Sequence, residues 1–229
     1  MKKMDIHSHT YYSFCGKDDP HLTIDAAIAG GLEIFGISDH NYGIGERKEA
    51  YFEEITGLKK EYEGRITLLC GIEISVLPQF YDIKEGELER FDYCLVELNA
   101  EGNLAEDNLV DYAKGWNIPT GIAHTDLFAF CEKKGFDTEE FFKQLAKNNI
   151  FWEMNVNYDS IHRYREHEYV KRFMEDELQQ ELVKKTGLAI SVGFDGHRVE
   201  DYLPERVLDA CQRLTEIGVR SAEEIIFKN

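Results

Sequence analysis

The chain has 229 residues, of which 43% are hydrophobic, 31% charged and 12% aromatic, a composition typical of a globular protein with a sizeable core. Its 26 lysines and arginines against 44 aspartates and glutamates give a formal net charge of −18, which argues against binding to long nucleic acids. No apolar run approaches the roughly 18 to 20 residues that span a bilayer, and residues 1–10 lack the apolar stretch of a secretory signal. We therefore expect a cytoplasmic protein that binds no membrane.

Short apolar runs alternate with longer amphipathic runs along the chain, which predicts strands and helices alternating around a parallel sheet. The seven predicted strands cover residues 4–7, 34–38, 66–74, 93–98, 120–123, 150–156 and 188–193. The predicted helices cover residues 24–30, 46–62, 104–116, 137–147, 166–186 and 205–217. Asp137 has a side chain suited to a helix N-cap, and Gly187 is expected to end the helix before it.

The domain organisation follows from the same pattern. No linker-like segment divides the sequence, so we expect one α/β domain over residues 1–229. Several predicted strands are almost continuously apolar, as parallel strands covered on both faces are. A closed α/β barrel and an open doubly wound sheet both fit this pattern.

The cysteines give no sign of a disulfide framework or a zinc ribbon. They are five in number, and none forms a CxxC pair. We expect reduced thiols, with Cys70 and Cys94 acting as small buried hydrophobic residues.

Histidines and acidic residues gather where the predicted strands end. The segments are DIHSH at 5–9, SDH at 38–40, GIE at 71–73, AHTD at 123–126 and GFDGH at 193–197. They hold five of the eight histidines of the chain. Because the carboxyl ends of parallel strands lie on one face of such a fold, these side chains are expected to meet there.

The spacing within two of these segments predicts a metal site. Residues i and i+2 of a strand point the same way, so His7 can converge with His9, and Asp195 with His197. Imidazole and carboxylate ligands together suit zinc, manganese or iron. A single HxH pattern would be weak evidence, but five such segments in one chain predict a metal centre.

Six segments in fixed order resemble the polymerase and histidinol phosphatase (PHP) family of metal-dependent phosphoesterases. They are DIHSHT at 5–10, GLEIFGISDH at 31–40, GIEIS at 71–75, GIAHTDLF at 121–128, WEMNVN at 152–157 and GFDGH at 193–197. The resemblance implies a distorted (β/α)7 barrel with two to three divalent metal ions at the strand ends. It also implies the following ligands: His7, His9, Glu73 and Asp195 for one metal, Glu73 and His124 for a second, and His40 and His197 for a third.

The chain departs from the family pattern at two places. In histidinol phosphatases a further histidine follows the first motif and another ends the fourth strand, whereas residues 14–18 read FCGKD and residues 98–99 read LN here. Cys15 or Asp18 can replace the first missing ligand, Lys17 can instead supply positive charge, and Asn99 can ligate weakly. We therefore expect two well-occupied metal sites and a third that is weak or absent.

The resemblance implies hydrolysis of a phosphoester by a metal-bound hydroxide, without a protein nucleophile. Asp5, Asp39 and Glu153 are expected to orient ligands. Lys17, Arg163 and Arg198 are candidate phosphate-binding residues, the alternative for each being a solvated surface charge. His162 and His167 are expected to be exposed.

The expected activity is that of a phosphomonoesterase acting on a small phosphorylated metabolite. L-Histidinol phosphate is the leading named substrate, because the motifs look most like that branch of the family. One alternative is a nucleotide phosphodiesterase or exonuclease of the same family. Another is a metal-binding regulatory module without catalytic activity. The oligomeric state is not predicted.

Overall fold

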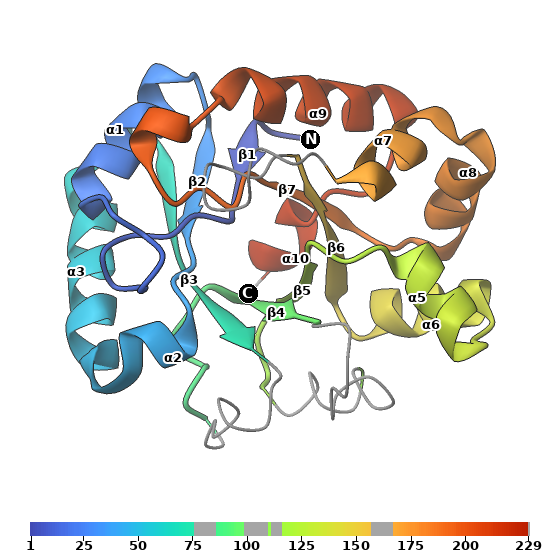
Figure 1. Ribbon diagram of the computed structural model, residues 1–229, viewed down its shortest axis with the longest axis horizontal. Coiled ribbons are helices and arrows are strands. Elements are labelled where there is room, and N and C mark those ends of the chain that lie inside the picture. Colours follow the sequence, from blue (N-terminus) through green and yellow to red (C-terminus); the bar gives the residue numbers. More distant parts are fainter. Residues whose placement is uncertain (76–85, 99–109, 111–115, 157–166, 229) are drawn as a thin grey trace.

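The computed structural model describes residues 1–75, 86–98, 110, 116–156 and 167–228, with a sheet of seven parallel strands at its centre (Figure 1). The strands are β1 (Met4–Asp5), β2 (Ile34–Ile37), β3 (Thr67–Ser75), β4 (Tyr93–Glu97), β5 (Thr120–Ala123), β6 (Ile150–Asn155) and β7 (Ile190–Gly193). Each strand pairs in parallel with the next along the chain. All seven predicted strands are confirmed, and their ends differ from the prediction by at most two residues.

Backbone contacts between the first and last strands close the sheet. The amide of Ile6 donates to the carbonyl of Val192 over 3.1 Å, and Ser8 forms a parallel bridge with Gly196 directly beyond the two strands. Figure 1 shows the strands around a common centre, with α10 (Glu223–Ile226) at the middle of the view and the other helices on the outside. The fold is therefore a distorted (β/α)7 barrel, the closed one of the two predicted alternatives.

The interior of the barrel is filled by side chains and is not a pore. The phenol of Tyr93 on β4 crosses the interior and donates to the carbonyl of Ile6 over 2.6 Å. Gly36 and Gly71 leave room for it, because a Cβ at either position would overlap the Tyr93 ring. This apolar filling leaves the carboxyl ends of the strands as the place where polar side chains gather.

Helices follow most strands, and all of them except α10 cover the outside of the barrel. They are α1 (Pro20–Ala29), α2 (Asn41–Ile44), α3 (Lys48–Glu61), α5 (Leu127–Lys134), α6 (Thr138–Lys147), α7 (Glu168–Glu175), α8 (Glu177–Thr186), α9 (Pro204–Ile217) and α10 (Glu223–Ile226), with 3-10 turns η1 (Gly45–Arg47) and η3 (Val199–Asp201). The two residues predicted to mark a helix start and a helix end are confirmed in these roles. Asp137 accepts a hydrogen bond from the amide of Glu140 at the start of α6, and Gly187 ends α8 at a φ of 72°.

The described helices differ from the predicted ones chiefly at two places. The single helix predicted over residues 166–186 is wrong, because the side chain of Asp176 caps a new helix by accepting from the amides of Leu178 and Gln179. Helix α5 was not predicted at all; Asp126 caps it by accepting from the amide of Ala129. The helix predicted over 104–116 lies almost wholly outside the described residues. Within the described part of the chain, no helix is both long and apolar enough to cross a membrane.

Candidate metal centre

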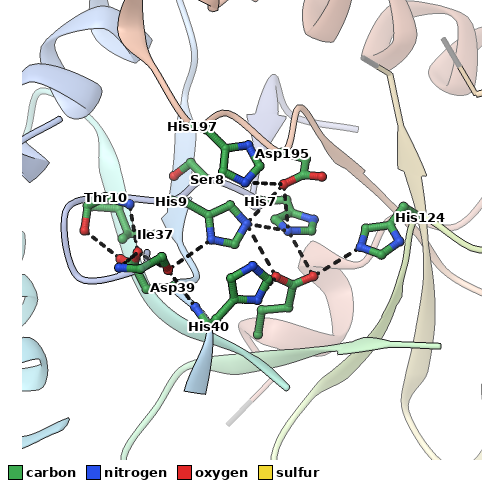
Figure 2. A network of polar contacts seen from close by, with 12 residues as sticks. His7, Ser8, His9, Thr10, Ile37, Asp39, His40, His124, Asp195 and His197 are labelled. Carbon is green, nitrogen blue, oxygen red and sulfur yellow. Dashed lines mark hydrogen bonds and ion pairs between the residues drawn. The ribbon is translucent and has the colours of Figure 1, made fainter. Parts of the chain in front are cut away.

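The seven side chains predicted to bind metal lie together at the carboxyl ends of the barrel strands. His7 and His9 follow β1, His40 follows β2, Glu73 lies in β3, His124 follows β5, and Asp195 and His197 follow β7. Figure 2 shows the imidazoles and the carboxylates turned toward one another, with segments from both ends of the chain side by side. Their role as metal ligands stays a prediction; their convergence is a property of the fold.

His7, His9 and Asp195 form one group of ligand atoms, all within 4.8 Å of one another. Nε2 of His9 lies 3.1 Å from Oδ1 of Asp195 and 3.2 Å from Nε2 of His7. All three side chains are buried. Two imidazole nitrogens and a carboxylate at this separation are a ligand set suited to zinc, manganese or iron.

Glu73 divides its two oxygens between the two sides of the cluster. Oε1 lies 3.3 Å from Nε2 of His7 and 3.3 Å from Nε2 of His124. Oε2 lies 3.4 Å from Nε2 of His9 and 2.7 Å from Nδ1 of His40. A fully buried carboxylate with this reach can bind two neighbouring cations at once.

Cys15 belongs to a second group, together with His9, His40 and His197, whose ligand atoms also lie within 4.8 Å of one another. The ring of His9 stacks between those of His40 and His197, with centroids 4.5 Å away on each side. Cys15 and Asp18 were the two residues expected to replace the missing ligand, and the fold brings only Cys15 into a candidate ligand group among the described residues.

Glu153 on β6 holds two of these residues in place. Its Oε1 accepts from Nδ1 of His7 over 2.7 Å, and its Oε2 accepts from the backbone amide of His124 over 2.7 Å. The contact leaves Nε2 of His7 facing the cluster. A histidine that binds a metal in this way usually donates its other nitrogen to a carboxylate, which fixes the tautomer and the ring.

Asp5 and Asp39 position backbone segments of the cluster. Asp5 accepts from the amides of His7 and Phe194 and from the hydroxyl of Tyr202, which ties β1 to β7. Burial raises the pKa of Asp5 to about 7, against the effect of these hydrogen bonds. Asp39 accepts from the amides and the hydroxyls of Thr10 and Ser13, which shapes the loop that leads to Cys15.

The pKa values of the cluster show strong mutual interaction. Burial lowers the pKa of His7, but the carboxylates of Glu153, Glu73 and Asp195 outweigh this and hold it well above its usual value. The pKa of His40 is likewise raised, mainly by Glu73 acting against burial. In contrast, burial together with the neighbouring His40 and His197 lowers the pKa of His9 to about 3.

Neighbouring histidines lower the pKa values of Glu73 and Cys15. Burial opposes ionisation of Glu73, yet His40 and His7 outweigh it and hold its pKa well below the usual value. The Cys15 thiol is also affected by burial, which raises its pKa, but His197 and His40 bring it down to about 7. Protons on His7 and His40 therefore offset the negative charge of the buried Glu73.

The donor set fits a divalent cation. Nδ1 of His40 and Oε2 of Glu73 form a largely buried ion pair 2.7 Å long. Buried charges need a partner of opposite charge, and a divalent cation bound by the carboxylate and the neutral imidazole would supply one. Two members also adopt a left-handed backbone, His124 at a φ of 28° and Asp195 at a φ of 57°. Strain of this kind costs on the order of 1–3 kcal/mol and is concentrated at functional sites.

The candidate phosphate-binding residues lie outside this cluster or outside the described residues. Lys17 is exposed, and its Nζ donates to the carbonyl of Phe14 over 3.2 Å. Arg198 contacts Glu200 over 3.2 Å and borders a small cavity between α1 and η3. Arg163, His162 and Asn99 fall among the residues that the structure does not describe.

Two residues near the cluster were not selected from the sequence. His167 is half-buried, which corrects the expectation that it is exposed, and its ring stacks on that of His124 with centroids 6.3 Å apart. Glu97 ends β4 and pairs with Ser75 of β3, so it lies on the same side of the sheet as Glu73, one pleat nearer the barrel mouth. The family pattern has a histidine at the end of the fourth strand, and Glu97, directly before Leu98, is a carboxylate at that strand end.

The chain is similar to known proteins in sequence and in fold. The family model of the PHP domain matches residues 5–217. The histidinol-phosphatase of Lactococcus lactis is 26% identical over 116 residues, which cover 45% of this chain and 42% of that protein. The histidinol-phosphatase of Bacillus subtilis is 28% identical over 98 residues, 36% of this chain and 37% of that protein.

A solved structure shares the fold over nearly the whole chain. It is the histidinol phosphate phosphatase of Lactococcus lactis in complex with zinc, L-histidinol and phosphate, with a TM-score of 0.67, 20% identity and coverage of 96% of this chain and 95% of that one. The aligned segments of the two curated relatives span less than half of their lengths, so the match to the family model identifies the family. With that match extending over residues 5–217, the chain belongs to the PHP domain family.

Proposed function

We propose that the protein is a metal-dependent phosphomonoesterase that hydrolyses a small phosphorylated metabolite. The observation that carries this proposal is the buried cluster at the barrel mouth, in which Glu153 orients His7 and Glu73 faces four imidazoles. L-Histidinol phosphate is the first substrate to test, because two relatives are named histidinol-phosphatases and the solved neighbour holds L-histidinol and phosphate.

The residues divide into groups that would hold two to three divalent cations such as zinc, manganese or iron. His7, His9 and Asp195 supply one group, and Glu73 reaches from it toward His124 on one side and His40 on the other. Divalent cations in such a cluster lower the pKa of a bound water toward neutrality and offset the negative charge of a phosphoryl group.

The protein's own contribution is to hold the donors in place before substrate arrives. Asp5 and Glu153 fix His7 through its backbone amide and its ring, and Glu153 also fixes the backbone of His124. Because these groups are buried, they lose little freedom when the substrate binds, and water competes weakly for their contacts.

An aromatic stack leads outward from the cluster and suits the organic part of a small substrate. Tyr42 stacks on His40 at 4.8 Å and on Phe14 at 6.5 Å, and Phe14 is 76% exposed. A flat or apolar group attached to the phosphate can pack against these rings. This arrangement favours a small phosphomonoester over a long polyanion, as does the formal net charge of −18.

The proposal is tested by assaying purified protein, loaded with Mn²⁺, Zn²⁺ or Fe²⁺, against a panel of phosphomonoesters and phosphodiesters. We expect release of phosphate from monoesters, with L-histidinol phosphate among the best, and no release in excess chelator. A Glu73→Gln variant purified in the same way controls for a contaminating phosphatase. Hydrolysis of diesters alone would favour the nucleotide phosphodiesterase alternative, and no hydrolysis with any metal would favour the regulatory module.

A further inference from the structure

Cys15 lies among donors that already have the composition of a metal site. One nitrogen from each of His9, His40 and His197 and the sulfur of Cys15 lie within 4.8 Å of one another. His40 comes from the end of β2 and His197 from the end of β7, so residues far apart in the sequence build this group (Figure 2). Three imidazoles and one thiol are a known composition for binding zinc and similar cations.

The loop that carries Cys15 is anchored on both sides of the thiol. Ser13 donates its amide and hydroxyl to Asp39, and its oxygen accepts from the amide of His40 over 2.9 Å. Lys17 donates its amide to the carbonyl of His197 over 3.0 Å. The loop is thus attached directly to the segments that carry two of the histidines, which places the sulfur beside them.

The two rival residues of the loop have other contacts. The ammonium of Lys17 is exposed and contacts the carbonyl of Phe14. Oδ2 of Asp18 accepts from the amide of Val199 over 2.6 Å, which attaches the loop to η3. Asp18 joins none of the candidate ligand groups among the described residues.

We propose that Cys15 is a thiolate ligand of a divalent metal ion that His40 and His197 also bind. This inference rests on the proposed metal dependence and replaces the expectation that the third metal position is weak or absent. When the sulfur–metal bond forms, the thiol loses its proton to solvent. A thiolate adds a negative charge and a soft donor, so this position prefers zinc or cobalt to manganese or magnesium.

Cobalt substitution tests the bond directly. A thiolate bound to Co²⁺ gives an intense charge-transfer absorption in the near ultraviolet, which nitrogen and oxygen ligands do not. We expect this band when the metal-free parent protein is titrated with Co²⁺. Cys15→Ser and Cys15→His should both lose the band, and Cys15→His should keep the cobalt content of the parent because an imidazole replaces the sulfur. Cys131→Ser, which removes a buried thiol on α5, is the matched control and should keep the band.

Thiol alkylation gives a second readout. Cys15 is only partly buried, whereas the other four cysteines are buried, so alkylation of the native protein reports on Cys15. Zinc should slow the reaction by about tenfold or more, since a metal-bound thiolate is a poorer nucleophile, and manganese should slow it less. Mass spectrometry of the alkylated peptides identifies the modified residue.

The outcomes separate this inference from the proposed function. Absence of the charge-transfer band in cobalt-loaded parent protein would overturn the role of Cys15, even if the protein hydrolyses phosphomonoesters. A band that persists in Cys15→Ser would overturn it as well. A band lost only in the Cys15 variants would support the role of Cys15, even if no phosphoester is hydrolysed.

Discussion

His7 and Glu153 form a fully buried pair in which Nδ1 of the imidazole donates to Oε1 of the carboxylate over 2.7 Å. The pair joins the segment after β1 to β6, and it leaves Nε2 of His7 facing the cluster. The second oxygen of Glu153 accepts from the amide of His124, so one carboxylate positions two predicted ligands. Metal affinity should therefore depend on a residue that binds no metal.

Glu153→Gln tests this dependence. Glu153 uses both of its oxygens as acceptors, one for the ring of His7 and one for the backbone amide of His124. Glutamine has only one acceptor oxygen, so its amide nitrogen must face one of these two donors. We expect metal affinity to fall by about 10- to 100-fold, as is usual when such a supporting carboxylate is lost. Competition with a coloured chelator measures the affinity. Glu140→Gln, at an exposed site on α6, is the control, and equal affinities in the two variants would contradict the assigned role.

Gly193→Ala tests how closely this pair is packed. A Cβ at position 193 would overlap Oε1 of Glu153 and Cβ of His7. We expect a loss of about 1–3 kcal/mol in the free energy of unfolding, measured by urea denaturation, together with weaker metal binding. Gly57→Ala in α3 is the matched control, because a Cβ there meets nothing within 4 Å. It should stabilise the protein by roughly 0.5–1 kcal/mol, as alanine does within a helix. Equal stability of the two variants would refute the packing argument.

Metal binding should release protons near neutral pH. The pKa values of His7 and His40 are well above their usual values because neighbouring carboxylates outweigh burial, so both rings carry protons in the metal-free protein. A cation needs their neutral forms. Raising the pH removes the competing protons, so affinity should rise by up to about tenfold per pH unit for each proton released. Calorimetric titration in buffers of different ionisation enthalpy counts the protons. An affinity that is constant from about pH 6 to about pH 9 would contradict this linkage.

Glu73→Gln should be among the most damaging single changes. Its carboxylate lies within 3.4 Å of His7, His9, His40 and His124, so the loss of charge weakens contacts on both sides of the cluster. One charge-assisted contact is worth about 10- to 150-fold in kcat/KM, and we expect a loss at or beyond the upper end of that range. Glu53→Gln, on the exposed face of α3, should leave kcat/KM unchanged. Similar kinetics for the two variants would show that Glu73 has no central role.

The strands and the convergence of the predicted ligands could be read from the sequence for a physical reason. Parallel strands buried on both faces appear as short apolar runs, and their carboxyl ends must meet on one face of the sheet. The positions of His7, His40 and His124 follow from these two facts. Closure of the barrel does not, because it depends on the pairing of β1 with β7 and on no local signal.

Other features depend on contacts between distant residues. The break at Asp176 lies within a continuous amphipathic pattern, and the helix-capping preference of aspartate was the signal that the periodicity obscured. The position of Cys15 is set by contacts of its loop with Asp39 and His197, neither of which is near it in the sequence. His167, directly before α7, contacts His124, directly after β5, and no local sequence pattern predicts a contact between residues so far apart in the chain.

The measurement that tests the central claim most directly is metal content and phosphomonoesterase activity determined on the same sample, before and after chelation. We expect gently purified protein to hold at least one Zn, Mn or Fe ion per chain, because the buried donors of the cluster need a cation. Chelation should remove the metal and the activity together, and returning the metal should restore both. Metal-free protein that retains full activity in chelator would contradict the account.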